Sequence, residues 1–201
     1  MPTLAKSLKS GVTSIYWYFK SKDELLQALT DQVSRQIYQD LPSFGDRPWH
    51  QELFQYFVSF RELVGRSAVS REIFAYRVHF LFERAEMRSY VLRHLDAGLS
   101  YLVDAGLTLE EAADAINACS SFTRGFVVLE HGPGAASVEP SDHSREPDDR
   151  LRDISAYPLV DALGIDRMAD LDSRQFERGL RLVIEGMRSE VDARMASLEA
   201  D

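Results

Sequence analysis

The chain has 201 residues, of which 45% are hydrophobic and 27% are charged, and its formal net charge is −9. This composition is ordinary for a globular protein that buries a sizeable core. No apolar run is long enough to cross a membrane and no apolar leader follows Met1, so we expect a cytoplasmic protein without a membrane partner. The single cysteine, Cys119, cannot form an internal disulfide and offers no spacing typical of zinc ligands.

The charge is unevenly distributed along the chain. Residues 1–22 contain Lys6, Lys9, Lys20 and Lys22 and no acidic side chain, whereas the remainder is acidic overall. A local basic patch can bind phosphates while an acidic body keeps the rest of the protein away from a polyanion. The net negative charge therefore does not exclude a nucleic-acid partner.

Residues 4–19 are expected to form two short helices separated by a turn at Ser10-Gly11. At about 100° per residue, the second helix has an apolar face and a face that carries a hydroxyl, a phenol, an indole and an ammonium group. The first face comprises Val12, Ile15 and Phe19, and the second comprises Thr13, Tyr16, Trp17 and Lys20. This arrangement is typical of a helix-turn-helix whose second helix enters the major groove of DNA. The alternative is that Tyr16 and Trp17 pack against neighbouring helices.

Local signals then mark two longer helices. Ser21 with Glu24 forms a capping box that opens a helix ending near Leu41-Pro42, since the residue before a proline is pushed out of helical geometry. Pro48 suits the first turn of the next helix, which runs to Gly65.

The rest of the chain is also predicted to be helical. Residues 73–82 are apolar around nearly the whole helix, which places them centrally. Two further capping boxes each open a long helix, Thr108 with Glu111 and Asp172 with Gln175. Because no sustained alternation of apolar and polar residues occurs, we expect an all-α fold.

Residues 131–153 are rich in Gly, Pro, Ser and Asp and contain almost nothing apolar. Such a segment cannot bury enough surface to offset the entropy of ordering it. We expect a mobile loop, which is either a plain linker or a lid over a site.

Several stretches of the sequence together resemble one protein family. The segment LAKSLKSGVTSIYWYFKSKDELLQAL, residues 4–29, is similar to the helix-turn-helix signature of tetracycline-repressor (TetR) family regulators. The stretches SFREL at 59–63, SFTRGFVVLEH at 121–131 and FERGLRLVIEGM at 176–187 resemble the all-α ligand-binding and dimerisation domain of that family. The resemblance therefore covers nearly the whole chain.

The resemblance implies a helix-turn-helix domain with its connecting helix over residues 1–40 and a ligand-binding and dimerisation domain over 41–201. It also implies a homodimeric repressor that leaves double-stranded operator DNA when a small-molecule effector binds. Family members begin with a further helix, so we expect the first helix to be missing from this sequence. A second departure is Lys9-Ser10, which stands where Gly-Val is usual. We expect the helix that begins at Ser21 to act as the lever between the two domains.

The DNA contacts of the family carry over by position to the second short helix and the lysines that follow it. The predicted DNA-binding residues are Thr13, Ser14, Tyr16, Trp17, Lys20 and Lys22. A cation in the first turn of a helix is unfavourable unless a phosphate is nearby, which favours Lys22 as a phosphate ligand.

The effector pocket is expected in the larger domain, and the predicted lining residues are Tyr56, Phe60, Tyr76, His79, Ile116, Asn117 and Ser120. Of these, Ile116, Asn117 and Ser120 match positions that line the effector cavity of the family. His79 is either a pocket group or a satisfied core residue. A mostly apolar cavity with a few polar groups favours an apolar or aromatic effector. No cofactor and no metal is predicted, because neither His79 nor His94 can be aligned with the histidine that holds magnesium in tetracycline-binding relatives.

The dimer interface is predicted from small residues on two helices. Gly179 and Gly186 lie seven residues apart on one helix face, and each costs about 1 kcal/mol relative to alanine, so both need a packing reason. A four-helix bundle with a second copy supplies that reason. The predicted interface comprises Ala112, Ala115, Cys119, Gly179, Val183 and Gly186, with Ala118 as an alternative to Cys119. The same glycines would equally serve packing within one chain.

Two other classes of function were compared with this one. An enzyme is not expected, because the sequence shows no paired carboxylates at metal-bundle spacing, no Glu-x-x-His motif and no nucleophile with a positioned base. A helical small-molecule-binding or scaffold protein without DNA binding remains the alternative, because the first helix is expected to be absent.

Overall fold

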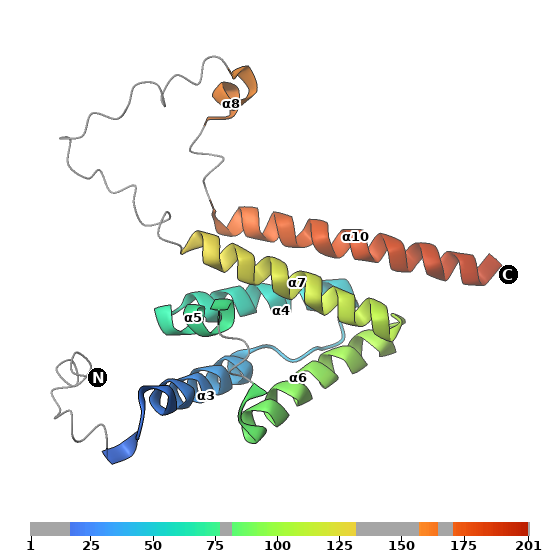
Figure 1. Cartoon of the computed structure of the whole chain (residues 1–201). Coiled ribbons are helices and arrows are strands. Elements are labelled where there is room, and N and C mark those ends of the chain that lie inside the picture. Colours follow the sequence, from blue (N-terminus) through green and yellow to red (C-terminus); the bar gives the residue numbers. More distant parts are fainter. Residues whose placement is uncertain (1–16, 77–81, 132–156, 165–170, 201) are drawn as a thin grey trace.

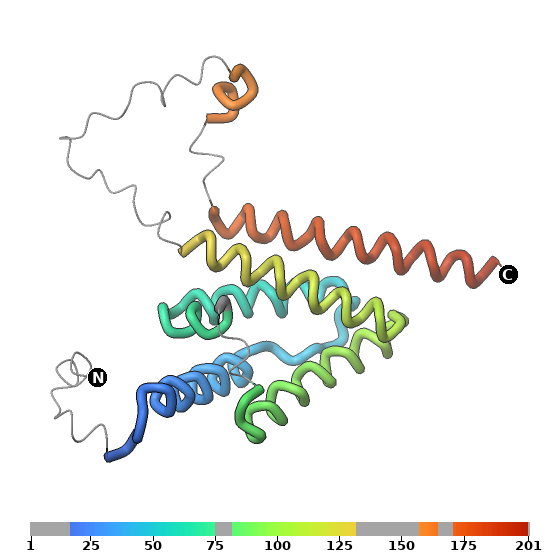
Figure 2. The backbone as a smooth tube through the Cα atoms, in the orientation of Figure 1, coloured from blue at the N-terminus to red at the C-terminus, as the bar shows by residue number. Residues whose placement is uncertain are grey.

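The computed structural model describes residues 17–76, 82–131, 157–164 and 171–200, apart from the side chains of residues 75 and 76. Within these ranges every regular element is helical (Figure 1; Figure 2), which confirms the expected all-α fold. Apart from His131, the predicted loop at 131–153 lies outside the described residues. No described helix has the length and apolar character needed to span a bilayer.

Helix α3 spans Lys22–Asp40, as its boundary residues predict. The Ser21 hydroxyl accepts a hydrogen bond from the Glu24 amide at 3.0 Å. The Glu24 carboxylate accepts in turn from the Lys20 amide at 2.7 Å, one residue before the partner that a capping box ordinarily uses. The helix ends at Leu41 because Pro42 has no N–H with which to continue the ladder.

Helices α4 (Trp49–Gly65) and α5 (Ala68–Tyr76) form the centre of the molecule. Helix α4 begins directly after Pro48, as predicted. Helix α5 begins before the predicted 73–82 segment, whose residues 77–81 lie outside the described ranges. The central position expected for this segment is confirmed at Phe74, which is fully buried.

Helices α6 (Ala85–Asp104) and α7 (Leu109–Glu130) form an antiparallel hairpin. Gly106 has a positive φ of 101° in the turn between them, a conformation that glycine adopts without strain. Helix α7 opens with the predicted capping box, in which Thr108 and Glu111 exchange hydrogen bonds of 3.2 and 2.7 Å. The sequence predicts helix in this region, but no local signal in it marks the start or the end of α6.

The last two described helices are α8 (Pro158–Leu163) and α10 (Ser173–Ala200). Helix α8 is short and contains no buried residue. Helix α10 follows Asp172, whose carboxylate accepts from the Gln175 amide at 2.7 Å, so the predicted start of this helix is confirmed.

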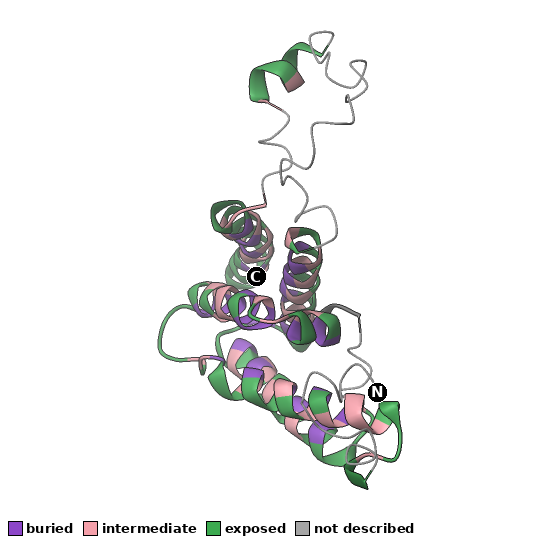
Figure 3. Ribbon diagram, turned by 90° about the vertical axis from the view of Figure 1, so that its left-hand side faces the viewer, coloured by how far each residue is buried: buried purple, intermediate pink, exposed green. Residues whose placement is uncertain are grey.

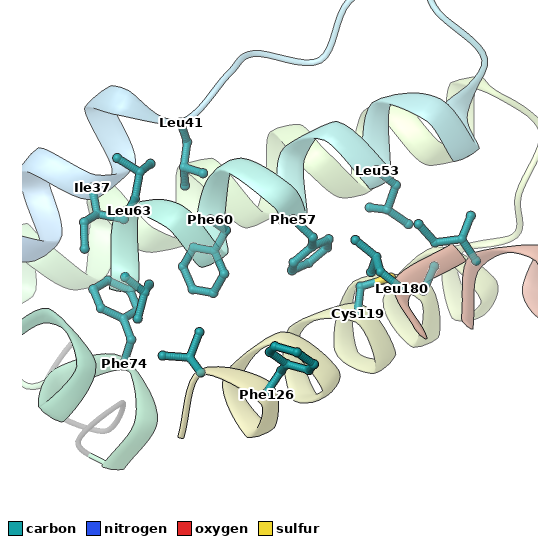
Figure 4. Close-up of a cluster of buried hydrophobic side chains, with 14 of the residues drawn as sticks. Ile37, Leu41, Leu53, Phe57, Phe60, Leu63, Phe74, Cys119, Phe126 and Leu180 are labelled. Carbon is teal, nitrogen blue, oxygen red and sulfur yellow. The ribbon is translucent and has the colours of Figure 1, made fainter. Parts of the chain in front are cut away.

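The helices are arranged in three layers. Helices α7 and α10 lie side by side, α4 and α5 form the middle layer, and α3 and α6 lie on its far side (Figure 1). Figure 3 shows that the buried faces of these helices point toward one another. The core between α4, α7 and α10 is built from large apolar side chains, among them Leu53, Phe57, Phe60, Phe126 and Leu180 (Figure 4).

One ionic cluster ties the upper two layers together. Arg61 of α4 is almost fully buried and forms an ion pair with Glu130 at the end of α7, with Nε of Arg61 3.1 Å from Oε2 of Glu130. Its Nη1 donates to the Ser173 hydroxyl of α10 at 3.1 Å. The guanidinium also lies over the rings of Phe126 and Phe176, 5.2 and 4.8 Å from their centroids. A buried cation needs such partners, because the charge has lost its hydration.

Candidate functional site

The amino-terminal segment is described from Trp17 onward, so Thr13, Ser14 and Tyr16 of the predicted DNA-binding set lie outside the described residues. Trp17 is 78% exposed and its ring makes an edge contact with Tyr18, with the centroids 4.8 Å apart. Lys20 and Lys22 are also exposed, at the start of α3. These three side chains are free to contact DNA, and their role in binding stays a prediction.

A cavity of about 640 Å³ lies between the end of α3, the connector that joins α3 to α4, and helices α4 and α6. Aromatic rings dominate its wall; these are Tyr38, Phe44, Tyr56, Tyr90, His94 and Tyr101. The volume lies in the range of pockets that hold small organic molecules. The cavity is thus large enough for a ligand of several rings.

Two tyrosines of the wall carry deeply buried hydroxyls. Burial raises the pKa of Tyr38 to about 12, although the positive charge of Arg124 opposes the shift. Burial also raises the pKa of Tyr56 well above its ordinary value. Both phenols are therefore neutral at physiological pH, and each can donate and accept a hydrogen bond. The cavity offers polar contacts to a ligand without a fixed negative charge on these groups.

His94 connects α6 to the last turn of α3. Its Nε2 lies 3.1 Å from the Tyr38 carbonyl, which has no helical donor because Pro42 lacks an N–H. Its Nδ1 lies 3.2 Å from the Tyr90 carbonyl one turn earlier in α6. The imidazole ring is also 4.9 Å from the rings of both Tyr38 and Tyr90. His94 thus fixes the end of α3 against the cavity wall.

Arg124 of α7 carries a positive charge near this cluster. Its Nε is buried without a hydrogen-bond partner, and burial lowers its pKa, an effect that Tyr38 opposes. Among the described residues no carboxylate forms an ion pair with Arg124. Arg124 does not line the cavity itself, so its charge acts on the wall through Tyr38.

A second hollow, of about 410 Å³, lies between α4 and α10, but its charged groups already have partners. Arg47 is paired with Glu52 at 3.0 Å, and Arg181 lies over the Phe54 ring at 4.2 Å and near Glu177 at 3.9 Å. The aromatic cavity is therefore the better candidate for a ligand site.

The predicted pocket residues are only partly brought together. Tyr56 lines the cavity, whereas Phe60 is buried in the core against Phe57 and Phe74. The three predicted α7 residues do not line it: Ile116 packs near Gly98, Asn117 is exposed and Ser120 is half-buried. The side chain of Tyr76 and the whole of His79 lie outside what the structure describes.

Sequence analysis missed most of the aromatic wall. Tyr90, His94 and Tyr101 lie on α6, whose start and end were not predicted because its first flanking residue, Arg84, makes no side-chain cap. Their spacing of four and then seven residues would have placed them on one helix face.

The predicted dimer residues on α7 lie inside the single chain, and the interface itself stays a prediction. Ala112, Ala115 and Cys119 are completely buried within the single chain, whereas Ala118, the predicted alternative to Cys119, is exposed. Burial also raises the pKa of the Cys119 thiol to about 12, which makes it unreactive.

The two glycines of α10 differ from each other. A Cβ atom at Gly179 would lie 2.5 Å from Cζ of Phe122, so this glycine serves packing within the chain. A Cβ atom at Gly186 would meet nothing within 4 Å, and Val183 is half-buried against the core. Of this pair, only Gly186 faces outward.

Comparison with known proteins agrees with this architecture. The profile described as "Tetracyclin repressor-like, C-terminal domain" matches residues 41–191, and that of "Bacterial regulatory proteins, tetR family" matches residues 1–29. The chain is 31% identical to the HTH-type transcriptional repressor Rv1353c of Mycobacterium tuberculosis over 92% of this chain and 70% of that protein. It is also 31% identical to the class C tetracycline repressor protein of Escherichia coli, over 92% of this chain and 78% of the repressor.

Among solved structures, the TetR family protein ActR of Streptomyces coelicolor in complex with actinorhodin is similar in fold, with a TM-score of 0.60, 23% identity, and coverage of 95% of this chain and 87% of ActR. A possible TetR family regulator from the same species gives a TM-score of 0.63 at 22% identity, over 93% of this chain and 87% of that one. Because the C-terminal profile matches most of the chain, this protein belongs to the TetR family of DNA-binding transcriptional regulators.

Proposed function

We propose that this chain is a homodimeric repressor that a small apolar or aromatic effector releases from operator DNA. The observation that supports this most strongly is the position of the aromatic cavity. Helix α3 begins with Lys22, beside the predicted DNA contacts, and its last turn contributes Tyr38 to the cavity wall. An effector in the cavity therefore touches the end of a helix whose other end borders the DNA-binding segment.

The effector acts by population shift. It favours the conformation in which α3 holds the recognition helices at a spacing that no longer matches successive major grooves, and only a difference in affinity between the two conformations can drive release. Small-molecule binding by this fold is supported by ActR, which was solved in complex with actinorhodin.

The DNA contacts are proposed to come from residues 1–40, and the body over residues 41–201 binds the effector and the second copy. Lys20 and Lys22 contact phosphates, while Trp17 reaches into the groove. Each phosphate contact that is removed lowers the salt dependence of binding, so Lys20→Ala and Lys22→Ala should each reduce the slope of log K against log salt by about 1. Arg88→Ala, an exposed charge on α6, is the matched control and should leave the slope unchanged.

The dimer is proposed to form through the outward faces of α7 and α10. Gly125 and Gly186 lie in open space on these faces, and Leu129 and Leu182 are exposed beside them at 63% and 69%. Two such faces related by a two-fold axis build a four-helix bundle, in which glycine allows close approach of the helices. We therefore propose Gly186, which was already predicted, and Gly125 as the central interface positions.

The decisive experiment is fluorescence anisotropy with the DNA that lies upstream of the gene, using this chain and any in-frame extension encoded before Met1. Salt-dependent binding by a dimer, reversed by an aromatic compound that raises the melting temperature of the protein, supports the proposal. A chain that binds aromatic compounds but no DNA in either form would instead be a ligand-binding or scaffold protein.

A further inference from the structure

The connector between α3 and α4, residues 41–48, passes along the aromatic cavity and places one ring inside it. The ring of Phe44 lies between those of Tyr56 on α4 and Tyr101 on α6, with centroid distances of 5.1 and 4.8 Å. The interplanar angles are only 13° and 16°. The three rings therefore form a nearly parallel stack, and Tyr56 and Tyr101 act as the two walls of a slot for a flat ring.

The floor of this slot is shaped for the ring. Gly98 of α6 is buried beneath it, and a Cβ atom at this position would lie 3.3 Å from Cε2 of Phe44 and 3.5 Å from Cδ1 of Ile116. The first distance is tighter than an ordinary van der Waals contact and the second is an ordinary one, so a side chain here would press on the Phe44 ring. The absence of a side chain at Gly98 leaves the depth that a flat ring needs.

The second half of the connector is held firmly. The buried Glu52 carboxylate accepts from Nε and Nη2 of Arg47 at 3.0 Å each and from the Arg47 amide at 3.3 Å. The Tyr101 hydroxyl donates to the Arg47 carbonyl at 2.7 Å. Because Tyr101 contacts both Arg47 and the Phe44 ring, the slot and the anchor of the connector share one residue.

The first half of the connector leads directly into α3. Leu41 caps that helix and is buried, and Pro42 and Ser43 line the cavity together with Tyr38. Only three residues thus separate the end of α3 from Phe44. A displacement of the Phe44 ring can therefore move the end of α3, the helix that borders the DNA-binding segment.

We propose that the Tyr56–Tyr101 slot is the subsite for a flat aromatic ring of the effector, and that Phe44 occupies it until the effector displaces it. This inference rests on the proposed function, because it assumes that the aromatic cavity is the effector site. Phe44 competes with the ligand from within the chain, so the apparent affinity is reduced by the fraction of molecules in which the slot is free. The ligand class is a planar aromatic compound whose ring stacks between two neutral phenols.

The test uses 2-naphthol as the probe, titrated into the whole chain without DNA and followed by its fluorescence. Phe44→Ala removes the competing ring and should lower the Kd for 2-naphthol about tenfold, since ring occupancy of the slot then no longer opposes binding. Phe44→Leu, which keeps apolar volume without a flat ring, should also bind more tightly than the unmodified chain. Phe54→Ala is the matched control, because Phe54 is half-buried on the same helix as Tyr56 but does not line this cavity; it should leave the Kd unchanged.

A second measurement reports on the ring itself. With 4-fluorophenylalanine at position 44, the ¹⁹F resonance should move from a shielded, stacked position toward that of an exposed ring when 2-naphthol is added. This readout does not depend on the stability of any variant at position 44.

The proposal is overturned if both Phe44 variants bind 2-naphthol as weakly as the unmodified chain or more weakly, or if the ¹⁹F resonance does not move at saturation. It is equally overturned if no form of the chain binds the probe. These measurements contain no DNA, so they do not test the repressor proposal, which the anisotropy experiment tests. A chain that binds 2-naphthol as predicted but binds no DNA would contradict the repressor proposal and support the slot.

Discussion

The two sides of helix α4 are built differently. On the side that faces α7 and α10, large side chains such as Phe57, Phe176 and Leu180 are buried completely or almost so. The buried cation Arg61 has an ionic partner, a hydroxyl and two aromatic rings there. On the side that faces the connector and α6, aromatic rings surround a cavity, and single hydrogen bonds from His94 and Tyr101 hold the walls together. One face of the same helix is therefore closely packed, while the other borders a cavity.

The largest effect is expected on the packed side. Phe176 is fully buried; its ring stacks on that of Phe122 and makes an edge contact with that of Phe126, with centroids 5.5 and 5.2 Å away. Phe176→Ala should therefore lower the free energy of unfolding by about 3–5 kcal/mol. The half-buried Tyr90 on the cavity side is the comparison, and Tyr90→Ala should cost only about 1–2 kcal/mol. Urea unfolding measures both, and equal losses would remove the contrast between the two sides.

The ionic cluster on the packed side gives the next effect. Arg61→Met leaves Glu130 without its partner and should lower the free energy of unfolding by about 2–3 kcal/mol, somewhat less than a fully buried pair because Glu130 is 21% exposed. Adding Glu130→Met should recover part of this loss, because no unpaired charge then remains. A double mutant that is no more stable than Arg61→Met would show that the packing of Arg61 on the aromatic rings, and not its charge, carries the effect.

The two glycines of α10 form a matched pair. Gly179→Ala forces a methyl group against Phe122 and should cost about 1–3 kcal/mol of stability. Gly186→Ala meets open space and should stabilise the helix of a single chain by up to about 1 kcal/mol. Sedimentation velocity then tests the dimer, because Gly186→Leu should weaken association through the α10 face. An unchanged association of Gly186→Leu would speak against that face.

The smallest effect is expected on the pH dependence of stability, through the carboxylate of Glu52. The hydrogen bond from Arg47 holds the pKa of Glu52 below its ordinary value of 4.5. A carboxylate with a lowered pKa contributes stability above its unfolded pKa and loses it as the pH falls through the folded value. The urea midpoint of the unmodified chain should therefore fall on acidification below about pH 4.5, and Glu52→Gln should show a weaker dependence in the same range. Identical pH profiles would mean that the connector is not held by this carboxylate.

Sequence patterns predicted the elements whose ends are set by local contacts. Ser21 and Thr108 accept from amides three residues ahead, so their own neighbourhood in the sequence marks the helix starts. Helix α6 has no such cap. Its aromatic face can be recognised as a cavity wall only from the tertiary structure, in which α3 and the connector pack against it. Ala112, Ala115 and Cys119 of α7 pack inside the single chain, because a run of small side chains does not tell which neighbouring helix approaches it. Tyr56 was found because it lies on a helix with a clear start.

In the proposed function, occupancy of the aromatic cavity controls the affinity for operator DNA. Ala97 lines the cavity on α6, whereas Leu92 is exposed on the same helix and does not line it. Operator affinity measured by fluorescence anisotropy should fall at least about tenfold for Ala97→Trp, whose indole takes the place of an effector, and should be unchanged for Leu92→Trp. Equal operator affinities for the two folded variants would contradict the account.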